Sequence, residues 1–275
     1  MRCAWILLIP ALLLSLPVSA CTGVVISKDG TTVVGINEDW YRPNGYLWAE
    51  PAFGTSHAVV YFGYEIHDEF GRNDTPYWYE FQGINEAGLF FDSFSAPCSD
   101  ADPNVAKPIY PGRMEQLIMR RCSTVEEAVT LMTSYDPRFM RCIQYLLVDR
   151  TGAAAVVEHG DVIWMEDDTF ALTNFHLSSP PHGHSPCWRY TAAQRALEQN
   201  SNPTLDAITE ALDAAHSSGT MYSIVYDLAA SEAFVHCVGY TGDYDAPRVV
   251  DLDTLWRDGA DRTMLSALPH AEDEE

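Results

Sequence analysis

The fold is decided by the stretch SLPVSACTGVVISKDGTTVVGINEDW, residues 15–40. From Cys21 onward it holds two runs rich in Val, Thr and Ile, residues 21–28 and 31–39, on either side of Asp29-Gly30. β-Branched residues favour extended backbone, and an Asp-Gly pair between two such runs favours a tight turn. The stretch therefore predicts a β-hairpin that begins at Cys21.

The residues before Cys21 have the pattern of a secretory signal peptide, which we assign to residues 1–20. Arg2 gives a short positive region, and residues 4–17 form an apolar run that is short for a membrane span. Ser19 and Ala20 are small residues of the kind that signal peptidase accepts before its cut. We expect cleavage between Ala20 and Cys21, no integral membrane span in the mature chain, and a secreted or periplasmic protein.

The same residues allow a second fate for Cys21. The run VSAC, residues 18–21, also resembles a lipobox, whose cysteine carries a thioether-linked diacylglycerol and usually an acylated amine. Neither the sulfur nor the nitrogen of such a cysteine is free for chemistry. The alternative hypothesis is a lipid-anchored, non-catalytic envelope protein with Cys21 as its lipidation site.

The rest of the chain mixes strands with helices. Turn-bounded apolar segments predict further strands within residues 56–66, 76–95, 143–166, 170–177 and 219–240. Apolar residues at helical spacing predict two helices within residues 112–135 and one each over 187–200 and 205–217. Because strands come before, between and after the helices, we expect two sheets covered by helices, an α+β architecture in a single domain over residues 21–265.

The charge of the chain excludes some classes of partner. It has 16 basic and 39 acidic residues, a formal net charge of −23 at pH 7. A protein that binds nucleic acid needs a basic surface to displace counterions, so we expect no nucleic-acid partner. Part of the acidic excess lies in HAEDEE, residues 270–275, and we expect residues 266–275 to form a disordered tail.

The cysteines and histidines show no metal-binding pattern. Five cysteines follow Cys21 in a chain bound for an oxidising compartment, so at most two disulfides can form among them: Cys98, Cys122, Cys142, Cys187 and Cys237. The pair His182 and His184 is followed by no second pair of soft ligands, and we interpret it as a surface loop. We expect neither a metal nor a cofactor.

Cleavage before Cys21 would give this residue both a thiol and a free α-amine. The α-amine has an ordinary pKa near 8, which makes it a better proton acceptor at neutral pH than a lysine. Nucleophile and base would then share one residue, with no histidine required. Asp39, at the end of the second predicted strand, returns alongside the terminus and is placed to hold the amine.

Six motifs of the sequence, spread in order over nearly the whole mature chain, carry a family resemblance: CTGVVISKDG, GINEDW, GINEAGL, LLVDRTGAAAVVE, LTNF and WRYTAAQRAL. They resemble the choloylglycine hydrolase, penicillin V acylase and acid ceramidase group of N-terminal nucleophile hydrolases. The resemblance implies a four-layer αββα sandwich. It also implies hydrolysis of a linear amide in a small-molecule N-acyl substrate, through a thioester and without a cofactor.

The resemblance also assigns roles to residues of this chain. The nucleophile falls on Cys21 and the amine-holding aspartate on Asp39. Asn174, in the Thr-Asn motif, would donate a hydrogen bond to the oxyanion, and Arg189 would support the region of the nucleophile. The reaction type fits bile-acid conjugates, penicillins, acyl-homoserine lactones, ceramides and other lipid amides, and the oligomeric state, including a homo-oligomer, is left open.

Two positions depart from the family pattern, and one aromatic cluster is a further candidate. Ile36 stands where the family commonly has an arginine, which removes a cation that would lower the pKa of the thiol. Ser95 falls at or near an expected asparagine and keeps a shorter hydrogen-bonding group for the substrate. Trp78, in TPYWYEF, is a candidate for contact with the acyl group, although such clusters are more often sheet core.

A papain-like pairing of cysteine with a distant histidine is the rival catalytic scheme. His159 and His176 are the candidates for that histidine. The scheme needs the cysteine at the start of a helix after a longer lead, whereas Cys21 opens a strand.

The motif Gly-Ile-Asn-Glu at residues 35–38 and again at 83–86 is a weak sign of an internal repeat.

Overall fold

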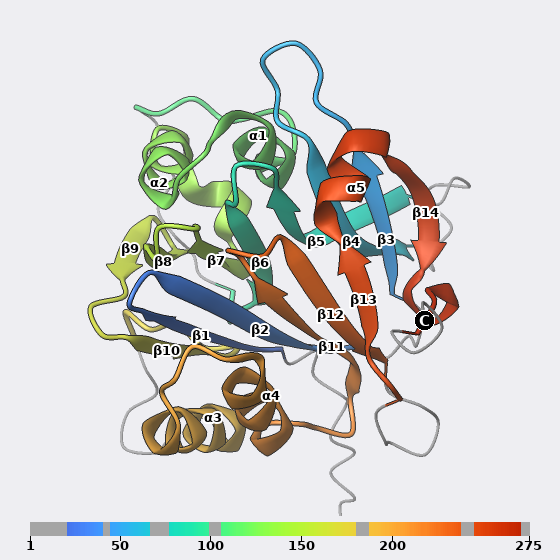
Figure 1. Cartoon of the computed structure of the whole chain (residues 1–275). Coiled ribbons are helices and arrows are strands. Elements are labelled where there is room, and N and C mark those ends of the chain that lie inside the picture. Colours follow the sequence, from blue (N-terminus) through green and yellow to red (C-terminus); the bar gives the residue numbers. More distant parts are fainter. Residues whose placement is uncertain are drawn as a thin grey trace, which may run out of the picture.

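The computed structural model describes residues 21–40, 45–66, 77–98, 106–179, 187–237 and 245–270. These residues form an α+β structure with two antiparallel sheets and five α-helices (Figure 1). The sequence predicts the α+β class, the two sheets and four of the helices; it does not predict the helix Leu252–Asp258. Residues 1–20, which the sequence assigns to a signal peptide, and residues 271–275, the end of the predicted acidic tail, lie outside the described residues. No helix in the described part of the chain is long and apolar enough to cross a membrane.

The first sheet is built around the hairpin that opens the described chain. Its strand order is β10-β1-β2-β11-β12-β13. The strands are β1 (Thr22–Lys28), β2 (Thr31–Asp39), β10 (Thr169–Leu172), β11 (Thr220–Asp227), β12 (Glu232–Cys237) and β13 (Arg248–Asp251). The β1–β2 turn uses Asp29 and Gly30, both with positive φ (53° and 82°), as a two-residue hairpin turn requires.

The second sheet has the strand order β14-β3-β4-β5-β6-β7-β8-β9. Its strands are β3 (Tyr46–Glu50), β4 (Val59–Ile66), β5 (Tyr77–Asn85), β6 (Phe90–Ser95), β7 (Ile143–Val148), β8 (Ala154–Glu158), β9 (Asp161–Trp164) and β14 (Ala260–Met264). The predicted strands within residues 76–95 and 143–166 all lie in this sheet; short turns join β5 to β6, β7 to β8 and β8 to β9, whereas helical segments lie between β6 and β7 in sequence.

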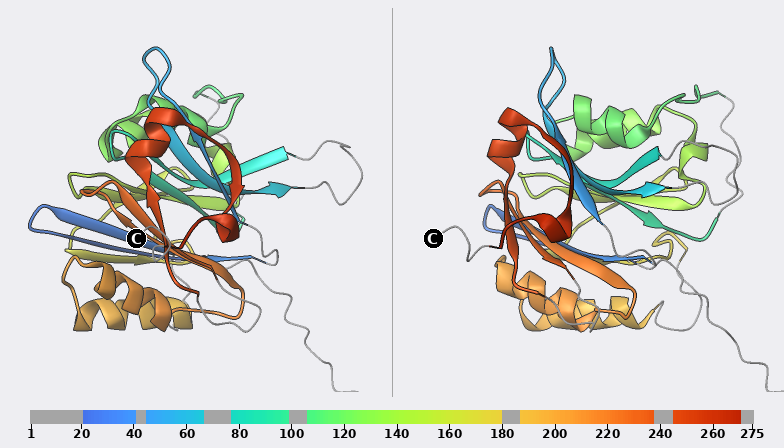
Figure 2. Two further views of the ribbon diagram at one scale, coloured as in Figure 1. Left: turned by 45° about the vertical axis from the view of Figure 1, so that its right-hand side comes forward. Right: turned by 90° about the vertical axis from the view of Figure 1, so that its right-hand side faces the viewer.

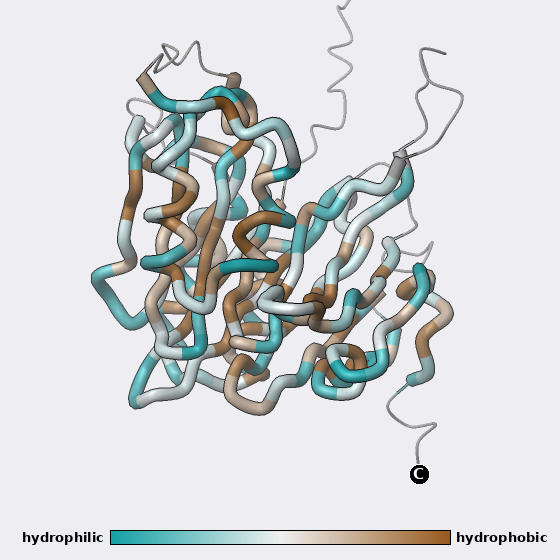
Figure 3. Tube along the Cα trace, turned by 90° about the horizontal axis from the view of Figure 1, so that it is seen from above, coloured by the Kyte–Doolittle hydropathy of each residue, from teal (hydrophilic) through white to brown (hydrophobic). Residues whose placement is uncertain are grey.

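Four of the five helices lie on the outer faces of the two sheets. On the second sheet lie α1 (Met114–Arg121) and α2 (Val125–Thr133), and on the first lie α3 (Trp188–Gln199) and α4 (Leu205–Ala214) (Figure 2). Outer hydrophobic clusters join each helix pair to its sheet, and a third cluster fills the space between the sheets. Figure 3 shows hydrophobic stretches toward the middle of the molecule and hydrophilic ones at the connecting turns.

The C-terminal part of the described chain packs beside the second sheet. It contains α5 (Leu252–Asp258) and the short 3-10 helix η2 (Leu265–Ala267); another, η1 (Pro137–Met140), follows α2. Arg248 Nε donates a hydrogen bond to the carbonyl of Leu268 at 3.1 Å. The first residues after 265, which the sequence assigns to the tail, therefore contact the body of the protein.

The two Gly-Ile-Asn-Glu motifs perform matching structural tasks. Asn37 on β2 donates Nδ2 to the carbonyl of Leu212 in α4 at 2.8 Å. Asn85 at the end of β5 donates Nδ2 to the carbonyls of Met119 and Cys122, at 2.9 and 2.8 Å, where α1 ends. Each motif thus uses its asparagine to tie one sheet to the helix pair that covers it.

Replacing Asn85 with alanine should lower the free energy of unfolding by about 3 kcal/mol, because the fully buried amide also accepts hydrogen bonds from the backbone N–H groups of Ala87 and Leu89. Urea unfolding followed by circular dichroism measures the change. The matched control is Asn202→Ala at an exposed position, where we expect a change within about 0.5 kcal/mol. Equal midpoints for the two variants would contradict the role assigned to Asn85.

Candidate active site

Cys21 lies directly before β1, in the interior of the molecule. Its strand is hydrogen-bonded to β2 on one side and to β10 on the other, and only 3% of the residue is exposed. A cavity of about 80 Å³ reaches the residue between the two sheets. The cavity is lined by Cys21, Glu38, Trp40, Tyr64, Tyr79, Phe81, Ser93, Ser95 and Ile143. Ser95, named from the sequence, therefore shares a cavity with Cys21.

Arg189 reaches Cys21 from the first turn of α3. Its Nη1 donates to the carbonyl of Cys21 at 2.6 Å and to Thr22 Oγ1 at 2.9 Å. The thiol of Cys187 accepts a hydrogen bond from the backbone N–H of Tyr190, which fixes the start of this helix. The buried guanidinium thus holds the backbone on which the thiol is mounted.

Asn174 follows β10 and links Arg189 to the second sheet. Its Oδ1 accepts a hydrogen bond from Arg189 Nη2 at 3.2 Å, and its Nδ2 donates to the carbonyl of Ser95 at 2.8 Å. Ser95 ends β6, and Cys98, a few residues further on, is joined by a disulfide to Cys142 before β7. Asn174 therefore connects Arg189 to Ser95, which lines the cavity.

Asp39 ends β2 and is held by two hydroxyl groups. Ser217 Oγ donates to its Oδ2 and Thr220 Oγ1 to its Oδ1, both at 2.6 Å. Burial raises the pKa of the Asp39 carboxyl, and these two hydrogen bonds oppose the rise. The backbone of Asp39 also hydrogen-bonds to the thiol of Cys21. The structure thus brings Cys21, Asp39, Asn174 and Arg189 to one place.

The surroundings of the thiol keep it protonated in the resting protein. Burial raises the pKa of Cys21 well above its ordinary value, and the nearby carboxyls of Glu38, Asp92 and Asp39 raise it further. Ile36 is fully buried in the core between the sheets, so its position supplies no positive charge. A proton acceptor is therefore needed for this thiol to react.

Two residues of the site escape the prediction from sequence, Glu38 and Asp92. Both are buried, with exposures of 4% and 0%. Side chains on alternate residues of a strand share a face, so Glu38 points with Ile36 between the sheets while Asn37 points to the helices. The sequence signal that could have identified them is a carboxylate inside a mostly apolar strand. For Asp92 this strand is β6, with the sequence FFDSFS.

Trp78 lies away from the cavity. Its ring packs edge-on against Trp48 and Tyr46, and the guanidinium of Arg262 lies 4.8 Å from its ring centre. Trp78 belongs to the cluster on the outer side of the second sheet, whereas its neighbour Tyr79 packs against the core between the sheets. The aromatic side chains that β5 contributes to the cavity are therefore Tyr79 and Phe81.

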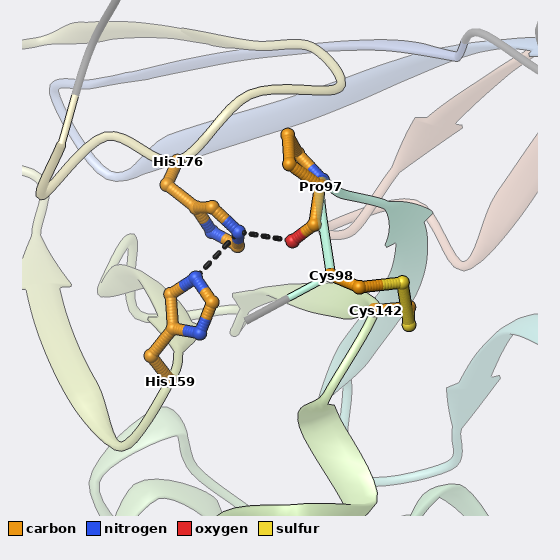
Figure 4. The surroundings of a disulfide bond; sticks show 5 residues. All are labelled: Pro97, Cys98, Cys142, His159 and His176. Carbon is orange, nitrogen blue, oxygen red and sulfur yellow. Dashed lines mark hydrogen bonds between the residues drawn. A yellow bond between two sulfur atoms is a disulfide. The ribbon is translucent and has the colours of Figure 1, made fainter. Parts of the chain in front are cut away.

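The two histidines of the rival scheme are engaged with each other. Their Nε2 atoms lie 2.5 Å apart, and His176 Nε2 lies 2.8 Å from the carbonyl oxygen of Pro97, next to the Cys98–Cys142 disulfide (Figure 4). Glu158 lies beside His176, with its Oε2 at 3.5 Å from Nδ1. This arrangement places both rings in a cluster of their own and gives no support to a papain-like pair with Cys21.

The described residues offer little to a metal ion. No group of three or more His, Cys, Asp or Glu side chains among them is arranged to hold one. His182 and His184 lie outside the described ranges. Of the cysteines after Cys21, the structure pairs Cys98 with Cys142 and leaves three as thiols: Cys122, Cys187 and Cys237.

Solved structures with the same fold come from a known class of hydrolytic enzymes. A variant of conjugated bile acid hydrolase from Clostridium perfringens matches with a TM-score of 0.65 and 16% identity, over 89% of this chain and 96% of that one. Penicillin V acylase from Agrobacterium tumefaciens matches with a TM-score of 0.55 and 16% identity, over 86% of this chain and 87% of that one. No protein-family model matches the sequence, and no curated protein is similar to it in sequence.

These matches establish the fold. Each covers more than four fifths of both chains, so the likeness extends beyond one motif or one sheet. They confirm, at the level of the fold, the resemblance that the six sequence motifs indicate.

Proposed function

We propose that this protein is a hydrolase that cleaves the linear amide bond of an N-acyl substrate, with Cys21 as the nucleophile. The observation that carries the proposal is the convergence on Cys21 of two polar groups from separate elements: Arg189 on its carbonyl and the Asp39 backbone on its thiol. Asn174 in turn accepts a hydrogen bond from Arg189. The fold shared with a bile acid hydrolase and a penicillin V acylase supports it. We assign residues 21–265 to a single αββα domain of the N-terminal nucleophile class.

The proposed reaction proceeds in two steps. The Cys21 sulfur attacks the amide carbonyl carbon, the amine leaves with a proton, and the acyl group stays on the sulfur as a thioester. Water then hydrolyses the thioester and restores the thiol. The developing oxyanion needs hydrogen-bond donors in a site that excludes water. We assign this task to Asn174, whose Nδ2 donates one hydrogen to the carbonyl of the cavity-lining Ser95 and keeps a second N–H for the oxyanion. The α-amine of a chain that begins at Cys21 would carry the proton.

The surroundings of Cys21 favour catalysis over lipidation. A lipid anchor needs the sulfur to reach the membrane, whereas Cys21 is 3% exposed and its carbonyl is held by a buried arginine. We therefore propose ordinary signal-peptide cleavage and a secreted or periplasmic enzyme that acts on a small-molecule N-acyl amide.

Trapping of the acyl-enzyme tests this function. The mature protein, exported by its own leader, is mixed with N-acyl amides that include bile-acid conjugates, penicillin V, acyl-homoserine lactones and ceramides. Intact mass after acid quenching should show one added acyl group, and peptide mapping should place it on a Cys21 that begins the chain. A diacylglycerol on Cys21, or no acylation by the whole panel, would contradict the proposal.

A further inference from the structure

Asp39 is gripped by a turn that lies far from it in sequence, residues 217–220 between α4 and β11. The backbone N–H of Thr220 donates to the carbonyl of Ser217 at 3.1 Å, which closes the turn. The carbonyl of Gly219 accepts a hydrogen bond from the backbone N–H of Trp40 at 2.9 Å, directly after Asp39. Backbone hydrogen bonds therefore fix the turn against the end of β2.

The two hydroxyl groups of this turn direct their protons at the carboxyl. Ser217 Oγ accepts from the backbone N–H of Gly219 at 3.1 Å and donates to Asp39 Oδ2 at 2.6 Å. Thr220 Oγ1 accepts from the backbone N–H of Ser217 at 3.1 Å and donates to Asp39 Oδ1 at 2.6 Å. An ionised carboxylate accepts hydrogen bonds at both oxygens, whereas a protonated carboxyl carries an O–H on one of them. The turn therefore matches the ionised form of Asp39.

A β-bulge brings Thr220 to this position. Thr220 lies opposite Asp39 and Tyr222 opposite Glu38, so Met221 is an extra residue in β11. Residues that lie opposite each other in an antiparallel pair have neighbouring side chains, and a bulge re-aims the side chains beside it. The irregular pairing at this end of β11 thus serves the contact between Thr220 and the carboxyl.

The position of Asp39 in the interior opposes its ionisation. The residue is 2% exposed, and burial raises its pKa. The titratable and charged groups around it are Cys21 before β1, Glu38 on β2, Arg189 on α3 and His216 after α4. Arg189 and His216 lower the pKa of Asp39, but the two hydroxyl groups lower it more.

We propose that Ser217 and Thr220 are positioning residues of the reaction, whose hydroxyl groups keep the Asp39 carboxylate ionised and oriented toward the α-amine of Cys21. The proposal rests on the function proposed above and deepens it. It gives a task to a Ser-Ser-Gly-Thr turn that has no other role in the site.

An ionised Asp39 assists the amine during the reaction. The amine takes the proton of the thiol and becomes an ammonium group before it passes that proton to the leaving nitrogen. A negative charge beside the amine favours the ammonium form, which helps the first transfer. Each carboxylate oxygen has more than one acceptor site, so the hydroxyl groups and an N–H of the amine can bind Asp39 together.

The test removes each hydroxyl group and measures turnover of an N-acyl amide that acylates the wild type. Thr220→Val and Ser217→Ala should each lower kcat by about 10- to 100-fold with KM changed only a few-fold, because each loses a hydrogen bond to a charged group. Thr220→Ser keeps the hydroxyl and should recover most of the loss. The matched control is Thr209→Val, which removes a hydroxyl that donates to the carbonyl of Leu205 within α4 at 2.8 Å.

A double-mutant cycle separates an effect through Asp39 from a general effect on the fold. Thr220→Val should lower kcat in the wild type but cause little further loss in Asp39→Asn, where no carboxylate remains to be held. Thermal melting verifies that each variant is folded. The same fold-change in both backgrounds would overturn the inference.

A second readout does not depend on turnover. In a mature chain that begins at Cys21 and carries cysteine labelled with nitrogen-15, the α-amine nitrogen reports its own titration by NMR. Both hydroxyl variants should move the midpoint of this titration to lower pH, toward that of Asp39→Asn, because the ammonium form loses a neighbouring charge. An unchanged midpoint in both would also overturn the inference. If no amide acylates the wild type, the proposed function fails, and this titration still decides whether the turn acts on the amine through Asp39.

Discussion

Cys21→Ala should abolish hydrolysis of every amide that the wild-type protein cleaves, a loss of at least about 10,000-fold in kcat. The other named residues act on the thiol or on its backbone, so removing the sulfur leaves them with no nucleophile to assist. Alanine keeps the side chain small in a site that is 3% exposed, so the fold should persist. The measurement is turnover of the amide that acylates the wild type, with circular dichroism to verify folding.

Cys122→Ala is the matched control, because Cys122 is also buried and free but belongs to the outer cluster under α1 and α2. It should cost stability but leave kcat close to that of the wild type. Cell fractionation of Cys21→Ala tests the lipid-anchor alternative in the same strains. Release of a previously membrane-bound protein, together with unchanged amide hydrolysis, would refute the nucleophile assignment.

Local pattern predicted the elements of the fold whose partners lie close in sequence. The hairpin at residues 21–39 follows from β-branched residues around Asp29-Gly30, and the helices of residues 112–135 and 187–217 follow from apolar spacing. By contrast, β3 pairs with β14 across more than 200 residues, Ala49 opposite Ala260. Neither short strand has a periodic pattern of its own, so only the folded chain reveals the pair.

The residues of the candidate site likewise divide into those that local strand pairing brings together and those whose approach depends on the packing of distant elements. Cys21 and Asp39 lie on one hairpin, and their closeness follows from strand pairing alone. Asn174 and Arg189 could be named only through the family resemblance, because their approach to Cys21 depends on how β10 and α3 pack. The sequence pattern identifies Asp39 and not its neighbour Glu38. Adjacent residues of a strand point to opposite faces, so naming one does not identify the other as part of the site.

Arg189→Met should lower both stability and turnover. Arg189 is 7% exposed, and its guanidinium donates to the Cys21 carbonyl, Thr22 Oγ1 and Asn174 Oδ1. Hydrogen bonds to a charged group contribute about 1.5–3 kcal/mol each, so the free energy of unfolding should fall by about 3 kcal/mol or more. Methionine fills much of the same volume, which limits the effect to the lost charge and donors. Urea unfolding and kcat are measured on the same preparation.

Two further variants separate the role of the guanidinium from that of a positive charge on α3. Arg195→Met removes an exposed arginine from the same helix and should leave the free energy of unfolding and kcat near their wild-type values. Arg189→Lys keeps the charge but cannot reach the Cys21 carbonyl and Asn174 with one planar group, so it should restore only part of the loss. Full activity in Arg189→Lys would show that charge alone suffices. A fall in kcat larger than the lost fraction of folded protein would show that Arg189 positions the thiol as well as stabilising the fold.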